Sequence, residues 1–101
     1  MSKSVILSKA AQLSFNAVSE YIFYKWGAKV AKEFVAKFQR ASVLIATNTT
    51  IYMLIDQDKR IRRCVLTRHN VIYFREDQDF IVILAVFDTR QNPENVRNLL
   101  K

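Results

Sequence analysis

The sequence predicts an α+β domain in which a helical hairpin packs on a mostly antiparallel sheet, in the order β-α-α-β-β-β with a short C-terminal helix. Two patterns lead to this fold class. Apolar residues recur every three or four positions through most of the first half, as in helices, and short apolar runs between polar turns fill the second half, as in strands. The 101 residues, with one glycine and one proline, suffice for a single domain, residues 1–101, without a flexible linker.

The N-terminal part predicts a strand followed by a helix. Ser4 to Leu7 is a short apolar run, and the hydroxyl of Ser8 after it can cap a helix. Gly27 then marks the end of the helix, because glycine adopts a left-handed backbone at little cost. The apolar residues between them are spaced four, three, four and four apart and share one helix face: Ala11, Phe15, Val18, Ile22 and Trp26.

A second helix is predicted from roughly Lys29 to Thr47, antiparallel to the first. Its apolar face consists of Ala31, Phe34, Phe38, Ala41 and Ile45. The aromatic residues near the turn are expected to pack at the hairpin tip: Tyr21, Tyr24 and Trp26. The polar run 47–50 ends the second helix, and the apolar run Ile51 to Ile55 after it fits either a strand or a short helix on the core.

The remaining elements are predicted strands with a terminal helix. Ile61 to Leu66 and Val71 to Glu76 form a hairpin around the turn 67–70. Phe80 to Phe87 is apolar at every position, which is typical of a strand in the interior of the sheet, covered on both faces. At the end of the chain a short helix is predicted from a capping residue, a proline and three apolar residues: Asn92, Pro93, Val96, Leu99 and Leu100.

Positive charge is concentrated between residues 59 and 75. Six of the sixteen Lys and Arg residues lie there, with no Asp or Glu among them, in a chain of net charge +7. A basic stripe is the usual footprint of a phosphate backbone or an acidic peptide, and the guanidinium fork suits bidentate binding of either. The arginines are therefore candidates for partner binding, unless they only solvate an exposed strand or protect a sheet edge: Arg60, Arg62, Arg63, Arg68 and Arg75.

Composition also excludes several classes of protein. One glycine leaves no Gly-rich loop, which excludes nucleotide sites of the P-loop or Rossmann type. The only cysteine, Cys64, cannot form an internal disulfide and is expected to be a small buried hydrophobe. One Cys and one His also cannot make a structural zinc site. We expect a cytoplasmic protein with no metal or other cofactor, since neither a membrane span nor a signal peptide is recognisable.

Several short motifs, taken in order, resemble the RelE/ParE superfamily of bacterial type II toxins, also called plasmid-stabilisation toxins. The likeness runs from about Ile6 to Leu100. It rests on Tyr21-Ile22 before Trp26-Gly27, Ala31 and Phe34 beyond the turn, Ile61-Arg62-Arg63-Cys64-Val65, Tyr73-Phe74-Arg75, and Phe87-Asp88-Thr89-Arg90-Gln91-Asn92-Pro93. The resemblance implies a cytoplasmic bacterial toxin that an antitoxin encoded beside it holds inactive.

The resemblance leaves two mechanisms open. RelE-like toxins cut messenger RNA in the ribosome without a metal, and ParE-like toxins poison DNA gyrase and lack a catalytic set. Candidate catalytic residues for the first mechanism are Arg63, His69 and Arg90, as charge stabilisers and as general acid or base. Two positions depart from the nuclease pattern, because Asn70 replaces a strand arginine and Val96 replaces the tyrosine of the last helix.

Three functions follow as hypotheses. The favoured one is a toxin that binds a target such as DNA gyrase, because the long helical hairpin, the Trp26-Gly27 turn and the Tyr73-Phe74-Arg75 ending are ParE-like. The second is a ribosome-dependent endoribonuclease, and the third is a basic nucleic-acid-binding module without toxicity. Under the first two hypotheses, we expect Arg90 to join the five arginines of the basic segment in binding the target or the antitoxin.

Overall fold

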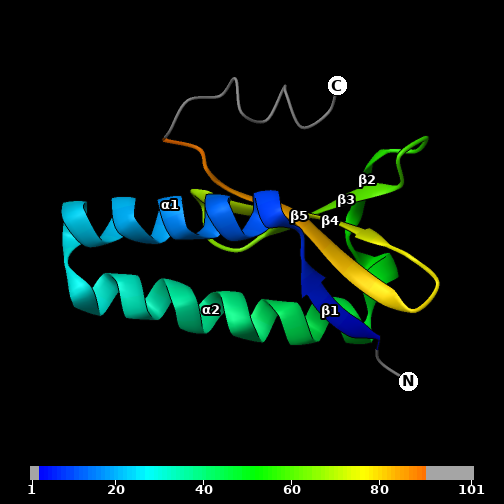
Figure 1. The fold of residues 1–101 in the computed structure, drawn as a ribbon, viewed down its shortest axis with the longest axis horizontal. Coiled ribbons are helices and arrows are strands. Elements are labelled where there is room, and N and C mark those ends of the chain that lie inside the picture. The colour runs from blue at the N-terminus through cyan, green and yellow to red at the C-terminus, as the bar shows by residue number, and fades with distance from the viewer. Residues whose placement is uncertain (1–2, 91–101) are drawn as a thin grey trace.

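The structure, a computed structural model, describes residues 3–90 and has the predicted α+β architecture. Helices α1 (Lys9–Trp26) and α2 (Ala28–Thr47) form an antiparallel hairpin that covers one face of a five-stranded sheet (Figure 1). The strands are β1 (Ser4–Leu7), β2 (Met53–Asp56), β3 (Ile61–Val65), β4 (Asn70–Glu76) and β5 (Phe80–Asp88). The helix predicted from Asn92 onward lies outside the described residues.

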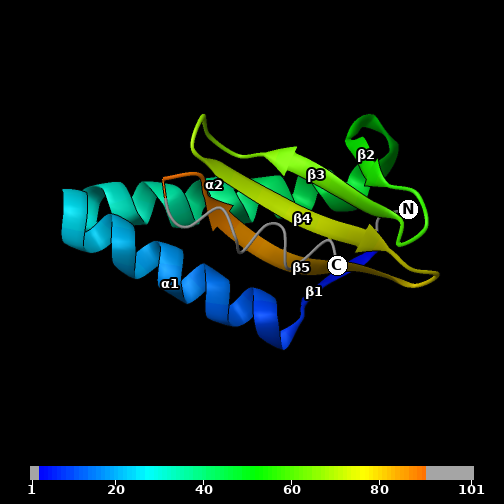
Figure 2. The same ribbon diagram turned by 90° about the horizontal axis from the view of Figure 1, so that it is seen from above.

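The sheet is mostly antiparallel, as predicted, with the strand order β1-β5-β4-β3-β2. Among the described strands only β1 pairs in parallel, with β5, and it forms one edge of the sheet (Figure 2). β5 has a neighbour on each side, which confirms that this apolar run is an interior strand. Of its two faces, which were both expected to be covered, the described helices cover one. In the part of the chain that is described, Ile81 and Ile83 are fully buried, whereas Val82 and Leu84 on the same strand are half-buried.

The apolar run Ile51 to Ile55, for which the sequence allowed either a strand or a short helix, contributes to both. Residues Thr49–Ile51 make one turn of 3₁₀ helix, and β2 follows as an edge strand antiparallel to β3. The Thr49 hydroxyl donates to the Ile45 carbonyl at 2.8 Å, which continues the direction of α2 for one turn. The Arg62 side chain then donates to the Tyr52 carbonyl at 2.7 Å and fixes the entry into β2. The predicted order thus gains one short edge strand.

The helices begin and end where the sequence predicts, and their apolar faces form the core. The Ser8 hydroxyl accepts the Ala11 N–H at 3.0 Å and caps α1. The buried core lies between the hairpin and the sheet and includes Val18, Ile22, Phe34, Phe38, Ile45, Ile72, Phe74, Ile81, Ile83 and Val86. One expectation at the hairpin tip is wrong, because Tyr24 touches Phe23 edge to face but is 82% exposed. Its position on α1 points away from the sheet, where the apolar period gives no partner.

Gly27 alone connects the two helices. Its N–H donates to the Phe23 carbonyl at 2.8 Å, and its own carbonyl accepts the Ala31 N–H at 3.2 Å, so it ends α1 and begins α2. Its φ of 92° has the positive sign that was predicted, but its ψ of 179° places it outside the ordinary left-handed helical region. Backbone of this kind is essentially restricted to glycine.

Replacing Gly27 should therefore destabilise the fold through the backbone alone. No atom lies within 4 Å of the position that a Cβ would occupy, so steric clash with neighbours does not contribute. We expect both Gly27→Ala and Gly27→Asn to lower the free energy of unfolding by about 1–3 kcal/mol in urea titrations. Asn gains little over Ala because the ψ value does not suit the left-handed conformation that Asn tolerates. Unchanged stability in both variants would contradict this account of the turn.

Candidate functional site

The arginines of residues 59–75 do not form one stripe in the folded chain. Arg60, in the β2–β3 turn, and Arg75, on β4, both face Asp77 of the β4–β5 turn. The Arg75 Nε is 3.0 Å from the Asp77 carboxylate and the Arg60 Nη2 is 3.6 Å from it. Lys3 adds to the same group with an ion pair to Glu76 at 3.1 Å. These charges are paired at one end of the sheet. Because acidic side chains neutralise them, these basic residues add less positive charge to the surface than the sequence alone predicts.

Arg62 and Arg63 point to opposite faces of the sheet, since successive side chains of a strand alternate. Arg62 lies opposite Phe74, on the helix side, and is held by the Tyr52 carbonyl. Arg63 is exposed and lies opposite Tyr73 on the other side. Burial raises the pKa of Tyr73, and the positive charge of Arg63 offsets part of that rise. Of these two arginines, only Arg63 remains available to a partner.

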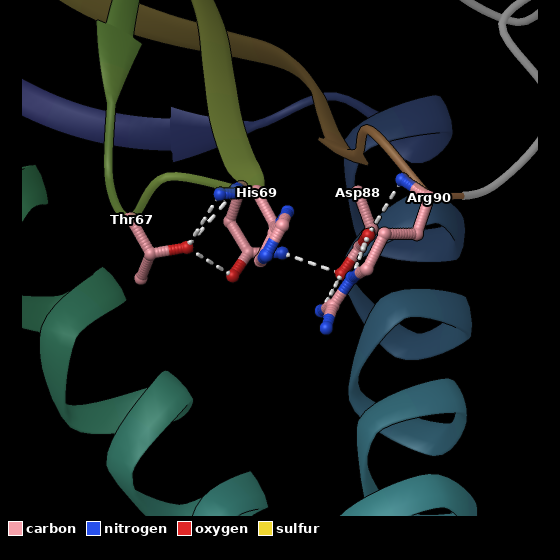
Figure 3. A network of polar contacts seen from close by, with 5 residues as sticks. Thr67, His69, Asp88 and Arg90 are labelled. Atoms are coloured by element: carbon pink, nitrogen blue, oxygen red, sulfur yellow. Dashed lines mark hydrogen bonds and ion pairs between the residues drawn. The ribbon is translucent and has the colours of Figure 1, made fainter.

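At the opposite end of the sheet, a polar network joins the ends of β4 and β5 (Figure 3). The Asp88 side chain is fully buried, and the Arg90 guanidinium donates to both of its oxygens, from Nε at 2.8 Å and from Nη2. The Arg90 backbone N–H donates to the same carboxylate at 2.9 Å. Asn70 donates to it from the other side at 2.9 Å. The buried charge is thus paired and fully hydrogen-bonded, as burial of a carboxylate requires.

The β3–β4 turn supplies the other half of this network. The Thr67 hydroxyl donates to the Asn70 side-chain oxygen at 2.7 Å and accepts the backbone N–H groups of His69 and Asn70 at 3.1 and 3.0 Å. The His69 carbonyl accepts the Thr89 N–H at 2.7 Å, which ties the turn to the end of β5. An amide at position 70 can donate to Asp88 and accept from Thr67 at once, which an arginine cannot do. This explains the asparagine there in structural terms.

Two aromatic rings of α1 pack against the Arg90 guanidinium, which also binds Asp88. Its guanidinium carbon lies 4.1 Å from the centre of the Trp26 ring and 5.7 Å from that of Tyr21. These distances are within the range of cation–π attraction. The two rings meet edge to face, with their centroids 5.7 Å apart. Trp26, which follows the apolar period of α1 but is half exposed, therefore forms a wall of this site.

A cavity of about 240 Å³ opens beside Arg90, between the helical hairpin and the β3–β4 turn. Its wall at the hairpin is mostly apolar but includes Glu33 and Lys37, and its wall at the turn is polar. They are formed by Ile22, Trp26, Val30, Glu33, Phe34, Lys37, Thr67, Asn70 and Arg90. Sites for cofactors and drug-sized ligands usually measure about 300–1,000 Å³. The size and lining of this cavity suit a single side chain inserted by a partner.

The charge state of the network follows from its contacts. Burial raises the pKa of Asp88, but the hydrogen bonds and positive charge of Arg90, with a further hydrogen bond from Asn70, outweigh this and leave the pKa below its ordinary value. The same pairing, chiefly the hydrogen bonds that Arg90 donates to Asp88, raises the pKa of Arg90. Both groups are therefore ionised at neutral pH. Arg90 is a neutralised, oriented guanidinium rather than an unpaired positive charge.

The lowered pKa of Asp88 predicts acid sensitivity. Because the carboxylate binds protons less readily in the folded chain than in the unfolded chain, its stabilisation is fully present above the unfolded pKa, about 3.9, and is lost as the pH falls through the folded pKa. We expect thermal stability to fall below about pH 4 more steeply in the wild-type chain than in Asp88→Asn. Parallel pH profiles for the two proteins would show that Asp88 is not the group responsible.

The structure separates the residues predicted to act together. His69 and Arg90 lie at the same end of the sheet, with exposed Arg68 on the adjoining turn. Arg63 lies on the other face of the sheet, and Arg60 and Arg75 lie at its other end. Sequence reasoning missed Thr67, Asp88 and Trp26 as site residues. The signal for Asp88 was a lone acid that ends a strongly apolar strand beside an arginine.

Within residues 3–90, no group of three His, Cys, Asp or Glu side chains is placed to hold a metal ion. Neither helix of that part is long and apolar enough to cross a membrane. The imidazole of His69 has no hydrogen-bond partner among the described residues. Around Arg90 the described chain therefore offers a small recessed cavity, an oriented guanidinium and two aromatic rings.

A family model described as the ParE toxin of the type II toxin-antitoxin system parDE matches residues 5–93 of this chain. The match takes in both helices, all described strands but the first residue of β1, and the Arg90 site. A comparison with curated protein sequences finds no significant match.

Solved structures share the fold at low sequence identity. A chain of the chromosomal ParDE toxin-antitoxin system of P. aeruginosa has a TM-score of 0.72 at 16% identity, over 85% of this chain and 95% of that one. A conserved hypothetical protein of Helicobacter pylori has a TM-score of 0.59 at 13% identity, over 88% and 97%. A chain of the toxin-antitoxin complex RelBE2 of Mycobacterium tuberculosis has a TM-score of 0.56 at 12% identity, over 87% and 99%.

Proposed function

The chain belongs to the ParE toxin family of type II toxin-antitoxin systems, and from this we propose that it inhibits growth by binding DNA gyrase and that a cognate antitoxin neutralises it. The binding mechanism is favoured over messenger RNA cleavage by one observation. The three candidate catalytic residues are not assembled around one point, because Arg63 lies on the sheet face away from the helices, whereas Arg90 lies against Trp26 of α1.

The state of Arg90 also favours binding over catalysis. A guanidinium that stabilises a phosphoryl transition state acts by positive charge aimed at the developing negative charge. Here Asp88 takes two of its donors and cancels that charge. His69 adds no clear general acid or base, since no described side chain orients its imidazole. A paired guanidinium against Trp26 suits recognition of a partner's side chain or backbone better than phosphate chemistry.

A cognate antitoxin is proposed as the second partner. Two of the solved relatives are described as components of toxin-antitoxin systems, ParDE and RelBE2. This chain has a net charge of +7 and exposes apolar residues beside its basic ones, among them Leu44, Met53 and Val65. An acidic segment that covers these residues as it binds would gain both charge attraction and apolar burial.

Induction in bacterial cells tests this function. We expect growth to stop when the chain is expressed and to resume when the small protein encoded beside its gene is expressed as well. DNA replication should fail before protein synthesis does, because gyrase is the target. If messenger RNA is instead cut within codons immediately after induction, the endoribonuclease is the correct function. If expression has no effect on growth in any host tested, the chain is not an active toxin.

His69→Ala separates the two mechanisms at one residue. A residue that transfers protons typically contributes about 10²- to 10⁴-fold in rate, so its loss would relieve growth arrest if the chain were a nuclease. We expect His69→Ala to arrest growth as strongly as the wild-type chain, measured by colony counts after equal expression. Lys29→Ala, at an exposed position of α2 away from this turn, is the control for an unspecific effect of the substitution. Recovery of growth with His69→Ala alone would favour catalysis.

A further inference from the structure

The helical hairpin has a groove of its own, apart from the Arg90 cavity. It consists of two hollows of about 370 Å³ each, and because Phe23 and Ala31 line both, the hollows adjoin. Every described residue in their walls belongs to α1 or α2. The end of the hairpin at Gly27 extends beyond the strands in both views (Figures 1 and 2). We call these two hollows together the hairpin groove.

The α2 wall of the hairpin groove is one continuous face of that helix. Ala28, Ala31, Val35 and Gln39 follow one another at intervals of three or four residues. From Ala28 to Gln39 the helix rises about 16 Å, which is about three turns. Because the backbone groups of a helix are bonded within it, the groove offers no open edge to an extended strand. Two helices side by side instead accept a third helix, whose side chains pack between them.

The hairpin groove is exposed although most of its lining is apolar. Phe23 is 50% and Tyr24 is 82% exposed, and their rings meet edge to face with centroids 5.7 Å apart. Ala28, beside them in the groove, is exposed as well. Single exposed apolar residues are common, but neighbouring ones that line a hollow are typical of a binding surface. Aromatic residues are also enriched in the cores of interfaces. The occupant therefore needs apolar side chains of its own.

The charge of the hairpin specifies the occupant further. Six basic residues lie on α1 and α2, against two acidic ones, Glu20 and Glu33. Glu20 is the only acid among the described lining residues, and Lys32 lines the groove without an ion pair to any described residue. A second copy of this chain would bring like charges together, and DNA has no apolar side chains to cover the groove. A helix with apolar side chains on one face and acidic ones beside them is complementary in both respects.

We propose that the hairpin groove is the surface by which this chain binds DNA gyrase, and that an acidic amphipathic helix of gyrase occupies it. Apolar side chains of that helix pack against Phe23 and Ala31, and an acidic one faces Lys32. The hairpin groove and the Arg90 cavity have no described lining residue in common, so a partner at the cavity leaves the groove uncovered. This inference rests on the proposed function, in which gyrase is the target, and it assigns the surface that the target contacts.

Phe23→Ala tests the apolar part of the groove, with Leu13→Ala as its matched control. Phe23 lines both hollows, whereas Leu13, on the same helix and 62% exposed, is not among the described lining residues. Affinity is measured by surface plasmon resonance on immobilised purified gyrase. We expect Phe23→Ala to weaken binding at least about tenfold and Leu13→Ala to change it less than about threefold. Binding of the small protein encoded beside the gene should change less than about threefold in both variants, which shows that they are folded.

Ala28→Glu tests the charge of the occupant, because it places a carboxylate in the groove at an exposed position. Ala28 is the first residue of α2, where an acidic side chain favours the helix, so the fold is kept. Ala10→Glu makes the same change at an exposed position in the first turn of α1 and is the control. We expect Ala28→Glu to weaken gyrase binding at least about tenfold by repelling the acidic helix, and the control to change it less than about threefold.

The outcomes separate the groove from the proposed function. If Phe23→Ala does not fold, Ala28→Glu decides. Gyrase binding that Ala28→Glu leaves unchanged would overturn the groove and leave the proposed function standing. The groove would also be overturned if Ala28→Glu released the adjacent-gene protein, or separated a dimer of this chain into monomers, while gyrase binding stayed unchanged. If the wild-type chain binds no gyrase at all, both the groove and the proposed target are wrong.

Discussion

Arg90→Ala is expected to lower the free energy of unfolding by about 3–5 kcal/mol, because it leaves the buried carboxylate of Asp88 without its countercharge. The Asp88 side chain has no exposed surface, and among the side chains of residues 3–90 only that of Asn70 would still donate to it. A small domain is stable by about 5–15 kcal/mol in total, so a loss of this size leaves the variant close to unfolding at ordinary temperatures.

Urea denaturation followed by circular dichroism measures this effect, with Arg68→Ala as the matched control. Arg68 is exposed on the neighbouring turn, and its removal should change stability by no more than about 0.5 kcal/mol. The double variant Asp88→Leu with Arg90→Ala should recover much of the loss, since it removes the buried charge together with its partner. Arg90→Ala as stable as the control would mean that the network contributes nothing to folding.

Trp26→Ala is expected to weaken binding of the adjacent-gene protein by about thirtyfold or more, which corresponds to about 2 kcal/mol. Tryptophan is enriched among the few residues that dominate binding energy, and here its ring forms a wall of the cavity and carries the Arg90 guanidinium. Because the ring is half exposed, its loss should affect stability much less than the loss of a core residue such as Phe38.

Tyr24→Ala is the control for this effect. Tyr24 is also a large aromatic residue near the end of α1 and is more exposed than Trp26, but it lies on the outer side of the hairpin and lines a different hollow. We expect its removal to leave affinity within about threefold of the wild-type value. If Tyr24→Ala weakens binding and Trp26→Ala does not, the partner occupies the outer face of the hairpin instead.

The helices and most strands could be predicted from the sequence because their apolar residues repeat with the period of the element. Val18, Ile22, Phe34 and Phe38 fall on predicted faces and are buried. Ser8 and Gly27 mark the helix ends by local backbone chemistry that needs no tertiary contact. The edge strand β2 was left open because its position depends on Arg62 and on pairing with β3, and neither is visible in a short apolar run.

The site was harder to predict because the strands place sequence neighbours on opposite faces of the sheet and bring distant residues together. Arg62 and Arg63 are adjacent in the chain and lie on opposite faces of the sheet, and Arg75 turns back to Asp77. Asn70 and Asp88 are eighteen residues apart and meet only through the register of β4 with β5. Counting charges along the chain therefore predicted one continuous basic stripe, which the folded chain does not have. It also missed Asp88, the buried acid that orients Arg90.

The central claim is that this toxin acts by binding DNA gyrase, and a supercoiling assay with purified gyrase tests it most directly. Relaxed plasmid DNA, gyrase and ATP are incubated with increasing amounts of the chain, and ribosomes with a defined messenger RNA receive the same amounts in parallel. The account predicts that supercoiling is lost, or that gyrase-bound DNA breaks accumulate, while the messenger RNA remains intact. Unimpaired gyrase together with messenger RNA cut in the ribosome would contradict it.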